Sequence, residues 1–269
     1  MNSSILSAVY NESMKKIVFP EANNEYIQAA AAKMAGTVEP ILEASDMIAA
    51  AQKVQDGEAD AVIAGIDFST RDVILGVREV FGMLDGYHVF TSICVAYLPD
   101  GRRYILSDCA TCKNPTAVQL AEIVELVNDA AAKILDDEPR VAMLSFSTFG
   151  SGTNDPSLDK IHEALDSVRA KRPDIVVDGE MQLDAAVNAR IGEKKSSAHG
   201  GSPVAGQANV LIVPDINAGN ILAKSLEQFA GAHIAGPILL GFKKPVSDLS
   251  RGSTVEDIVL TAEALSKLL

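Results

Sequence analysis

Short apolar runs alternate with longer segments of helical spacing along most of this chain. Val210–Val213 and Pro237–Leu240 are apolar runs that end in turn-forming residues, which is typical of buried parallel strands with chemistry placed where the strand stops. The first run is followed by the polar turn Pro214–Asn220, and the second by Ser247–Gly252. Each turn leads into a segment of helical spacing. The pattern predicts parallel strands whose ends carry polar turns.

The same alternation extends through the rest of the sequence. The predicted strands are Lys16–Glu21, Gly36–Leu42, Ala59–Gly65, Phe90–Leu98, Arg102–Ser107, Val141–Ser145, Ile175–Asp178 and Asn209–Val213. The predicted helices are Met1–Lys16, Ile27–Ala35, Ser45–Val54, Thr70–Val80, Thr116–Leu135, Pro156–Lys171 and Gln182–Arg190. The two strands on either side of Pro99-Asp100-Gly101 predict a β-hairpin, and the Ser- and Gly-rich segment Lys194–Gly206 predicts a loop. Strands that alternate with helices predict an α/β fold of mostly parallel sheets with helices on both faces.

Composition narrows the class of protein. The 269 residues are enough for a large core or for two lobes. The formal net charge of −13 makes the surface acidic, which argues against nucleic acid or an anionic membrane as a partner. No apolar run approaches the roughly 20 residues that span a bilayer, and the start of the sequence does not resemble a signal peptide. We therefore expect a cytoplasmic protein.

The cysteines and histidines give little support for a metal site. Cys109 and Cys112 form a C-x-x-C pair, the spacing of a redox pair or of half a zinc site, and Cys94 is the remaining cysteine. There is no second cysteine pair, and the four histidines lack ligand spacing. Reduced cysteines, no metal and no bound cofactor are the expectation.

The turn Ser250-Arg251-Gly252 is the strongest candidate for an anion site. In open α/β sheets the ligand lies at the carboxyl ends of strands, close to helix N-termini whose free N–H groups favour anions. A guanidinium offers several donors to a phosphate, and a neighbouring glycine leaves room for its approach. The alternative is a surface turn that caps the following helix. Spacing alone leaves both interpretations open.

Several longer motifs decide between classes of protein. They are N-P-T-A-V-Q-L-A-E-I, V-A-M-L-S-F-S-T-F-G-S, D-G-E-M-Q-L-D-A-A, P-D-I-N-A-G-N-I, A-G-P-I-L-L-G and K-P-V-S-D-L-S-R-G. In this order, and from about Asp108 to the C-terminus, the chain resembles the phosphate acetyltransferase and butyryltransferase family. The resemblance implies two α/β lobes of isocitrate/isopropylmalate dehydrogenase-like architecture with the active-site cleft between them. One lobe would comprise residues 1–84 plus 237–269, and the other residues 85–236.

The resemblance also implies an activity, the reversible transfer of an acetyl group between coenzyme A (CoA) and inorganic phosphate. Acetyl-CoA and phosphate are then substrates, no cofactor is needed, and we expect a homodimer. Arg251 would bind the phosphoryl group, Ser250 would donate a hydrogen bond to the reacting centre, and Asp257 would take the thiol proton. Alternatively, Asp257 belongs to a helix cap, because Ser253–Glu256 resembles a capping box. Other acyl preferences such as butyryl, a catalytically weak homologue that binds a CoA ester, and a non-enzymatic partner also remain open.

Further residues are expected to bind substrate. Asn217 and Gly219 would line the cleft, with helix capping as the alternative for Asn217. Donors for phosphate would come from the segment after Val141–Ser145, where an ordinary Ser/Thr turn is the alternative. These donors are Ser147, Thr148, Gly150 and Ser151.

The first part of the chain departs from the family pattern. The family has an arginine soon after its first P-E motif, and Pro20–Tyr26 contains none. Leu75 stands where a second arginine would fall, and Val89–Ser92 lacks another. Arg71 or Arg78 could substitute from the neighbouring turn. Arg71 follows a predicted strand end and is predicted to bind the phosphate, unless it pairs with Asp67.

Overall fold

The computed structural model describes residues 14–34, 36–152 and 155–269. Its strands are β1 Lys15–Phe19, β2 Val38–Leu42, β3 Ala61–Ala64, β4 Thr91–Tyr97, β5 Arg103–Ser107, β6 Val141–Leu144, β7 Val177–Met181, β8 Val210–Ile212, β9 His233–Leu240 and β10 Val246–Asp248. Its α-helices are α1 Glu25–Lys33, α2 Met47–Gln55, α3 Thr70–Phe81, α4 Ala117–Ile134, α5 Pro156–Lys171, α6 Leu183–Val187, α7 Ala189–Ser196, α8 Ile216–Ala230 and α9 Val255–Ser266. The predicted helix Met1–Lys16 lies almost wholly outside the described residues, and Lys15 already belongs to β1.

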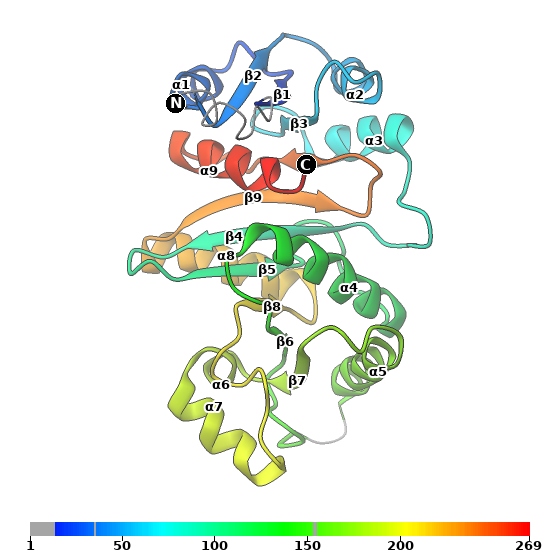
Figure 1. The fold of residues 1–269 in the computed structure, drawn as a ribbon, viewed down its shortest axis with the longest axis vertical. Helices are drawn as coiled ribbons and strands as arrows, with labels where there is room; N and C mark the ends of the chain where they lie inside the picture. The colour runs from blue at the N-terminus through cyan, green and yellow to red at the C-terminus, as the bar shows by residue number, and fades with distance from the viewer. Residues whose placement is uncertain (1–13, 35, 153–154) are drawn as a thin grey trace, which may run out of the picture.

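The described strands form one sheet in the order β2-β1-β3-β10-β9-β4-β5-β8-β6-β7 (Figure 1). Pairing is parallel at both ends of the sheet, from β2 to β10 and from β5 to β7. Only the pairs β10–β9, β9–β4 and β4–β5 in the middle of the described sheet are antiparallel. The predicted α/β fold with a mostly parallel sheet and an antiparallel hairpin is confirmed.

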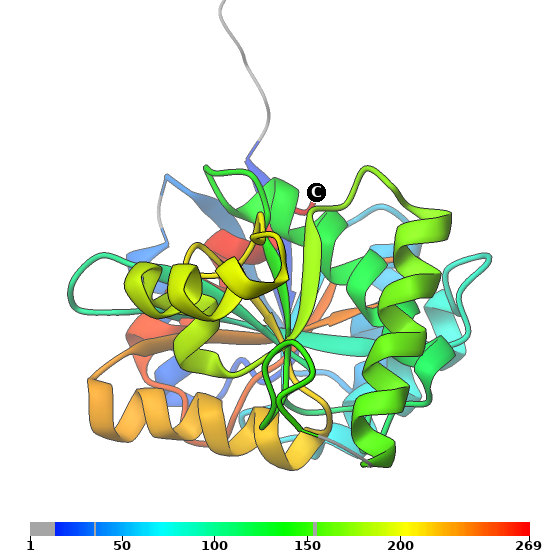
Figure 2. The same ribbon diagram turned by 90° about the horizontal axis from the view of Figure 1, so that it is seen from below.

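Both faces of the sheet are buried. Successive side chains of a strand point to opposite faces, and here both sets pack against helices. Ile17 and Phe19 of β1 join a core cluster with α1, α4, α5 and α9, whereas Val18 joins a cluster with α2 and α3. In the other half of the sheet, Ala142 and Leu144 of β6 pack in a cluster with α6 and α8. Figure 2 shows helices on both sides of the strands. The near-continuous apolar runs in the sequence follow from this double burial.

Two expectations about the C-terminal strands are wrong. β9 is antiparallel to both of its neighbours, β4 and β10, although its apolar run resembles a parallel strand. Ser247 and Asp248, predicted to open the polar turn Ser247–Gly252, belong to the buried strand β10, which pairs with β3. Its three residues include Ser247 and Asp248, so composition hides the strand. The turn begins only after Asp248.

A second correction concerns the segment after β7. The predicted helix Gln182–Arg190 is two helices, α6 and α7, because Asn188 ends the first and caps the second by accepting a hydrogen bond from Ile191 N at 3.2 Å. The predicted loop from Lys194 remains helical through Ser196. The proposed division into lobes would fall inside β9, between Gly236 and Pro237, although β9 pairs with β4 from Thr91 opposite Leu240 to Tyr97 opposite His233. It stays a prediction.

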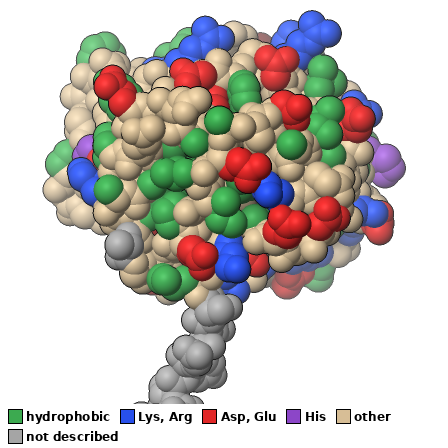
Figure 3. Space-filling view, turned by 90° about the horizontal axis from the view of Figure 1, so that it is seen from above, with side chains coloured by type: hydrophobic (Ala, Val, Ile, Leu, Met, Phe, Trp, Pro, Cys, Tyr) green, Lys and Arg blue, Asp and Glu red, His purple; other side chains and the backbone are tan. Residues whose placement is uncertain are grey.

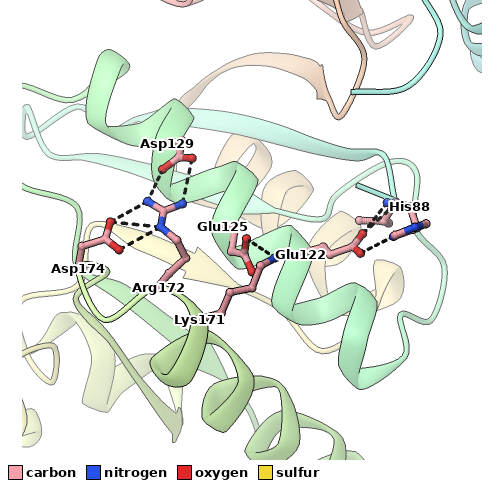
Figure 4. A network of polar contacts seen from close by, with 8 residues as sticks. His88, Glu122, Glu125, Asp129, Lys171, Arg172 and Asp174 are labelled. Carbon is pink, nitrogen blue, oxygen red and sulfur yellow. Dashed lines mark hydrogen bonds and ion pairs between the residues drawn. The ribbon is translucent and has the colours of Figure 1, made fainter. Parts of the chain in front are cut away.

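Charged side chains connect α4 to α5 and to the loop before β4 (Figure 4). Lys171 bonds the buried Glu125 at 2.9 Å, and Arg172, directly after α5, bridges Asp129 and Asp174. Glu122 accepts the backbone N–H groups of His88 at 2.8 Å and of Val89 at 3.1 Å. These contacts fix the two helices against each other at a distance from the candidate site.

The last features of the fold concern surface charge and the apolar length of the helices. At the end of the molecule formed by α1, β2 and α2, acidic and basic side chains are interspersed over the part of the face that the structure describes (Figure 3). None of the described helices is both long enough and apolar enough to cross a membrane.

Candidate functional site

A pocket of about 410 Å³ lies between α8, the start of β9 and the turns that follow β5 and β10. Its polar lining includes Thr70, Asn217, Lys224, Asp248, Ser250 and Asp257. Three of the predicted site residues, Asn217, Ser250 and Asp257, therefore lie in one pocket although they are far apart in the sequence.

The parallel pairing of β3 with β10 brings two turns together. Asp248 lies opposite Ala64, and Leu249 N donates to the Ala64 carbonyl oxygen at 2.6 Å. The turn after β3 and the turn Leu249–Ser253 consequently lie side by side, as parallel strands require. Thr70, at the start of α3, contributes to the pocket from the first of these turns.

The N–H groups of the turn after β3 are occupied by a carboxylate of the protein itself. Glu21, two residues after the end of β1, accepts hydrogen bonds from Gly65 N at 2.9 Å, Asp67 N at 2.7 Å and Phe68 N at 2.6 Å, and one from Ile66 N. A backbone turn of this kind is suited to bind an anion. Here Glu21 is that anion, so these donors are not available to a substrate phosphate.

Ser250 and Arg251 have different positions in the same turn. Ser250 lines the pocket and its Oγ lies 3.3 Å from Lys224 Nζ, which also bonds Glu227 Oε2 at 2.8 Å. Arg251 is exposed, is not part of the pocket lining, and has no hydrogen-bond or ion-pair partner among the described residues. Of the described residues that line the pocket, Lys224 is the only cation.

The carboxylate of Asp257 lines the pocket but is fully engaged. Its Oδ2 accepts Thr254 N at 2.8 Å and Thr254 Oγ1 at 2.7 Å, and its Oδ1 accepts Ile234 N at 3.2 Å and contacts His233 Nδ1 at 3.1 Å. Thr254 and Asp257 form the capping box of α9, one residue later than the predicted box at Ser253. A carboxylate has about four lone-pair positions, and three assigned donors together with the His233 ring nitrogen surround this one. The capping role left open by the sequence is present in the structure.

The start of α8 supplies the opposite wall of the pocket. Asp215 caps the helix by accepting Asn217 N at 2.8 Å and Ala218 N at 3.1 Å. The Asn217 side chain is therefore not the cap, and Asn217 is one of the residues that line the pocket. Gly219 does not line the pocket, and it packs so closely on the Asp108 carbonyl that a β-carbon would collide with it. Its role is close packing.

The loop after β5 is organised by a buried aspartate that the sequence did not indicate. Asp108 accepts hydrogen bonds from Thr91 Oγ1 at 2.9 Å, Ser92 Oγ at 2.5 Å and Cys112 N at 2.9 Å, with further donors at Ala110 and Thr111. This loop brings Cys109 and Ala110 into the pocket wall.

The two buried cysteines of the pocket wall, Cys94 and Cys109, are neighbours. A hydrogen bond with Cys94, together with burial, raises the pKa of the Cys109 thiol well above its usual range. Among the described residues no cluster of histidine, cysteine and carboxylate side chains has the arrangement of a metal site.

The predicted phosphate donors after β6 lie outside this pocket, and two of them bind a carboxylate. Ser147 Oγ donates to Glu180 Oε1 at 2.7 Å, and Gly150 N donates to the same oxygen at 2.8 Å. Ser151 Oγ accepts Thr148 N at 2.9 Å, and His162 Nε2 lies 2.5 Å from Glu180 Oε2. Burial is the largest influence on the Glu180 carboxyl and raises its pKa, but these hydrogen bonds together outweigh it and lower the pKa. The structure does not bring Ser147, Thr148, Gly150 and Ser151 together with Ser250.

Arg71 follows Thr70 on α3 but does not line the pocket. Its side chain is exposed, and the suggested partner Asp67 instead accepts a hydrogen bond from Asn24 Nδ2 at 3.0 Å. No ion pair of Arg71 exists within the described ranges. Leu75, at the position where the family pattern has an arginine, is 51% exposed.

Asp248 is the most unusual side chain of the pocket, and sequence reasoning missed it. It is 3% exposed, and no group among the described residues donates a hydrogen bond to its Oδ1. Burial raises the pKa of the Asp248 carboxyl to about 6, the negative charge of Glu21 adds to this, and a hydrogen bond from Thr70 opposes it. The only signal in the sequence is an acidic residue inside a predicted strand-end turn.

Comparison with known proteins gives the class to which this fold and pocket belong. The family model "phosphate acetyl/butaryl transferase" matches residues 36–265. The chain belongs to this family.

Individual relatives are named phosphate acetyltransferase. Over 205 residues, or 76% of the chain, it is 42% identical to a phosphate acetyltransferase from Nitrosomonas europaea and covers 29% of that protein. Over 215 residues, or 78% of the chain, it is 39% identical to a phosphate acetyltransferase from Clostridium acetobutylicum and covers 63% of that protein. The chain therefore spans less than two thirds of the length of both relatives.

Solved structures show the same fold. A phosphotransacetylase from Streptococcus pyogenes superimposes with a TM-score of 0.83 and 31% sequence identity, covering 95% of this chain and 94% of that one. A 4-hydroxythreonine-4-phosphate dehydrogenase from Burkholderia phymatum gives a TM-score of 0.55 at 11% identity, covering 94% and 98% of the two chains. At that identity the likeness concerns the fold alone, and it agrees with the expected dehydrogenase-like architecture.

Proposed function

We propose that this protein is a phosphate acyltransferase that transfers an acetyl group reversibly between CoA and inorganic phosphate. The observation that carries the proposal is family membership over most of the chain, together with phosphate acetyltransferases and a phosphotransacetylase as its relatives. The pocket supports it, because it combines a cation, hydroxyl groups and two buried carboxylates. These groups suit the binding of phosphate and the movement of protons.

The proposed reaction needs no metal and no bound cofactor, since CoA is itself a substrate. Ser250 in the pocket and its exposed neighbour Arg251 are proposed to hold the reacting centre and the phosphoryl group. Asn217 is proposed to contact substrate from the start of α8. A cytoplasmic location and a homodimer belong to the same proposal, and light scattering of the purified protein measures the second.

A related acyltransferase with weaker phosphate binding or another acyl preference is the second candidate. It is favoured by the scarcity of cations: Lys224 alone lines the pocket among the described residues, and Glu21 fills the neighbouring backbone turn. Losing charge-assisted contacts to a phosphate weakens its binding. This candidate predicts turnover only at high phosphate concentration, or faster turnover with a longer acyl group.

The test is the loss of thioester absorbance when the purified protein is mixed with acetyl-CoA and phosphate, repeated with propionyl-CoA and butyryl-CoA. Reactions without phosphate measure simple hydrolysis. Phosphate-dependent CoA release that is fastest with acetyl-CoA supports the first candidate. Faster release with butyryl-CoA supports the second, and the absence of phosphate-dependent release with all three esters rejects both.

A further inference from the structure

We propose that His233 is a positioning residue for Asp257, which keeps this carboxylate ionised and oriented for removal of the CoA thiol proton. The inference rests on the acyl transfer proposed above, with Asp257 as the carboxylate that accepts the proton. His233 is not part of the pocket lining, and it acts only through its contact with Asp257.

The two carboxylate oxygens of Asp257 have partners in different parts of the chain. Oδ2 accepts Thr254 N at 2.8 Å and Thr254 Oγ1 at 2.7 Å, and these bonds belong to the cap of α9. Oδ1 contacts the start of β9, where it accepts Ile234 N at 3.2 Å and lies 3.1 Å from His233 Nδ1. The helix cap therefore holds one oxygen, and β9 holds the other. His233 is not needed for the cap.

The chemistry of the contact assigns its direction. An ionised carboxylate only accepts hydrogen bonds, so His233 Nδ1 must carry a proton and donate it to Oδ1. A donor to the ionised form of a carboxyl group stabilises that form over the protonated one. The ring thus favours the state of Asp257 that can take a proton from the thiol.

No other titratable side chain among the described residues contacts the Asp257 carboxylate. Lys224 of α8 lines the same pocket but bonds Glu227 at 2.8 Å. Glu256, beside Asp257 on α9, is exposed. The remaining titratable groups of the pocket lining come from β10, from β4 and from the loop after β5, and they are Asp248, Cys94 and Cys109. His233 is consequently the group through which solvent pH acts directly on Asp257.

Burial differs between the two partners. The Asp257 side chain is 7% exposed, whereas the His233 side chain is 50% exposed. A buried carboxylate depends on its hydrogen-bond donors, but replacing a half-exposed ring leaves no large cavity. His233 begins β9 opposite Tyr97 of β4, and the bond from Ile234 N comes from the backbone. A substitution of His233 therefore removes one donor and leaves the rest of the arrangement in place.

The reaction that this arrangement serves balances without a further reactant. In the direction from acetyl phosphate and CoA, the Asp257 carboxylate takes the thiol proton as the sulfur attacks the carbonyl carbon. A C–S bond forms, the C–O bond to phosphate breaks, and the proton passes from Asp257 to the departing phosphate oxygen. The products are acetyl-CoA and HPO₄²⁻, and Asp257 is again ionised.

The experiment compares the parent with His233→Leu and His233→Asn in this direction, from about pH 4 to about pH 9. Leucine removes the donor, whereas the asparagine amide nitrogen can donate from nearly the place of Nδ1 but cannot become charged. The acid limb of kcat should move to higher pH by about one unit in His233→Leu, because the protonated carboxyl group is then less disfavoured. The limb of His233→Asn should lie between those of the parent and His233→Leu, and both KM values should change less than about threefold. The substrates titrate alike in all three proteins, so the order reports on the protein.

A matched control is His88→Leu. His88 Nδ1 also lies 2.9 Å from a buried carboxylate, that of Glu122, but outside the pocket (Figure 4). This variant should keep the kcat and the acid limb of the parent. Thermal melts of all variants are measured alongside, and His233→Ala replaces His233→Leu if the leucine variant does not fold.

The outcomes separate this inference from the proposed function. An acid limb at the parent's pH in His233→Leu, or a kcat lowered equally at every pH, overturns the positioning role while the acyl transfer stands. If neither the leucine nor the alanine variant folds, His233 is structural and the inference is withdrawn. Full turnover by Asp257→Asn would show that Asp257 accepts no proton, and the inference would fall with it. A parent protein without turnover rejects the proposed function itself.

Discussion

The Glu21 carboxylate accepts a hydrogen bond from the backbone N–H of Gly65 at 2.9 Å, across the end of β1 and the turn after β3. The same carboxylate holds the three following N–H groups of this turn. Because Gly65 also packs against Asp248, one buried acid positions the turn and adds negative charge beside another.

Replacing Glu21 by Gln should therefore have two measurable effects. The amide offers one acceptor oxygen and directs an NH₂ group at backbone donors, so the free energy of unfolding in urea should fall by at least about 2 kcal/mol. Removing the negative charge should also lower the pKa of Asp248, since Glu21 raises it, and shift the pH dependence of the unfolding free energy to lower pH. Glu25→Gln, an exposed change four residues later, is the control. An unchanged pH dependence of unfolding would mean that Glu21 does not influence Asp248.

Asp248 should make folding stability depend on pH with a defined sign. Its pKa is about 6 in the folded protein against an ordinary value of 3.8, so the folded state holds the proton more tightly. The stabilisation is fully present below about pH 4 and is lost as the pH rises through 6. A difference of about two pKa units corresponds to about 3 kcal/mol.

Asp248→Asn removes this titration. The variant should be more stable than the parent at pH 8, by up to about 3 kcal/mol, and the advantage should disappear near pH 4, where both side chains are neutral. Urea unfolding of both proteins at each pH measures it. Equal stability at all pH values would show that the carboxylate is solvated or paired in solution.

Much of the fold could be predicted because its signals are local. α5 was expected at Pro156–Lys171 and has these bounds, since a proline at the first turn and apolar spacing mark the helix within its own sequence. The three residues of β10 carry no such signal, because their strand character comes from pairing with β3 and β9. The antiparallel direction of β9 is likewise a property of its neighbours.

Site residues could be predicted from the sequence where they follow a strand end or begin a helix. Asn217, Ser250 and Asp257 were expected near one another and line one pocket. Asp248, Lys224 and Thr70 were not identified, because their importance depends on burial and on contacts between distant turns. The donors near Ser147 show the reverse case: their chemistry suits phosphate, but Glu180 of a neighbouring strand occupies two of them.

Lys224→Ala should raise the phosphate KM about tenfold to a hundredfold, because a charge-assisted hydrogen bond contributes roughly 1.5–3 kcal/mol and 1.4 kcal/mol is a factor of ten. Lys224 is the cation that lines the pocket among the described residues and lies beside Ser250. Lys194→Ala, an exposed lysine on α7, is the matched control. Steady-state kinetics with both substrates varied would refute the assignment if the phosphate KM changed less than twofold.

Arg71 tests whether the missing family arginines have a substitute. Its neighbour Thr70 lines the pocket, the turn before it lies beside Leu249–Ser253, and its side chain is exposed with no ion-pair partner among the described residues. It can therefore turn toward a phosphate bound near Ser250 without breaking an existing contact. Arg71→Ala should then raise the phosphate KM about tenfold to a hundredfold while leaving the acetyl-CoA KM and the melting temperature unchanged. Arg190→Ala, an exposed arginine on α7 that does not line the pocket, is the comparison. If the phosphate KM of Arg71→Ala stays within twofold of the parent, the pocket binds phosphate without this residue, and the candidate with weaker phosphate binding is favoured.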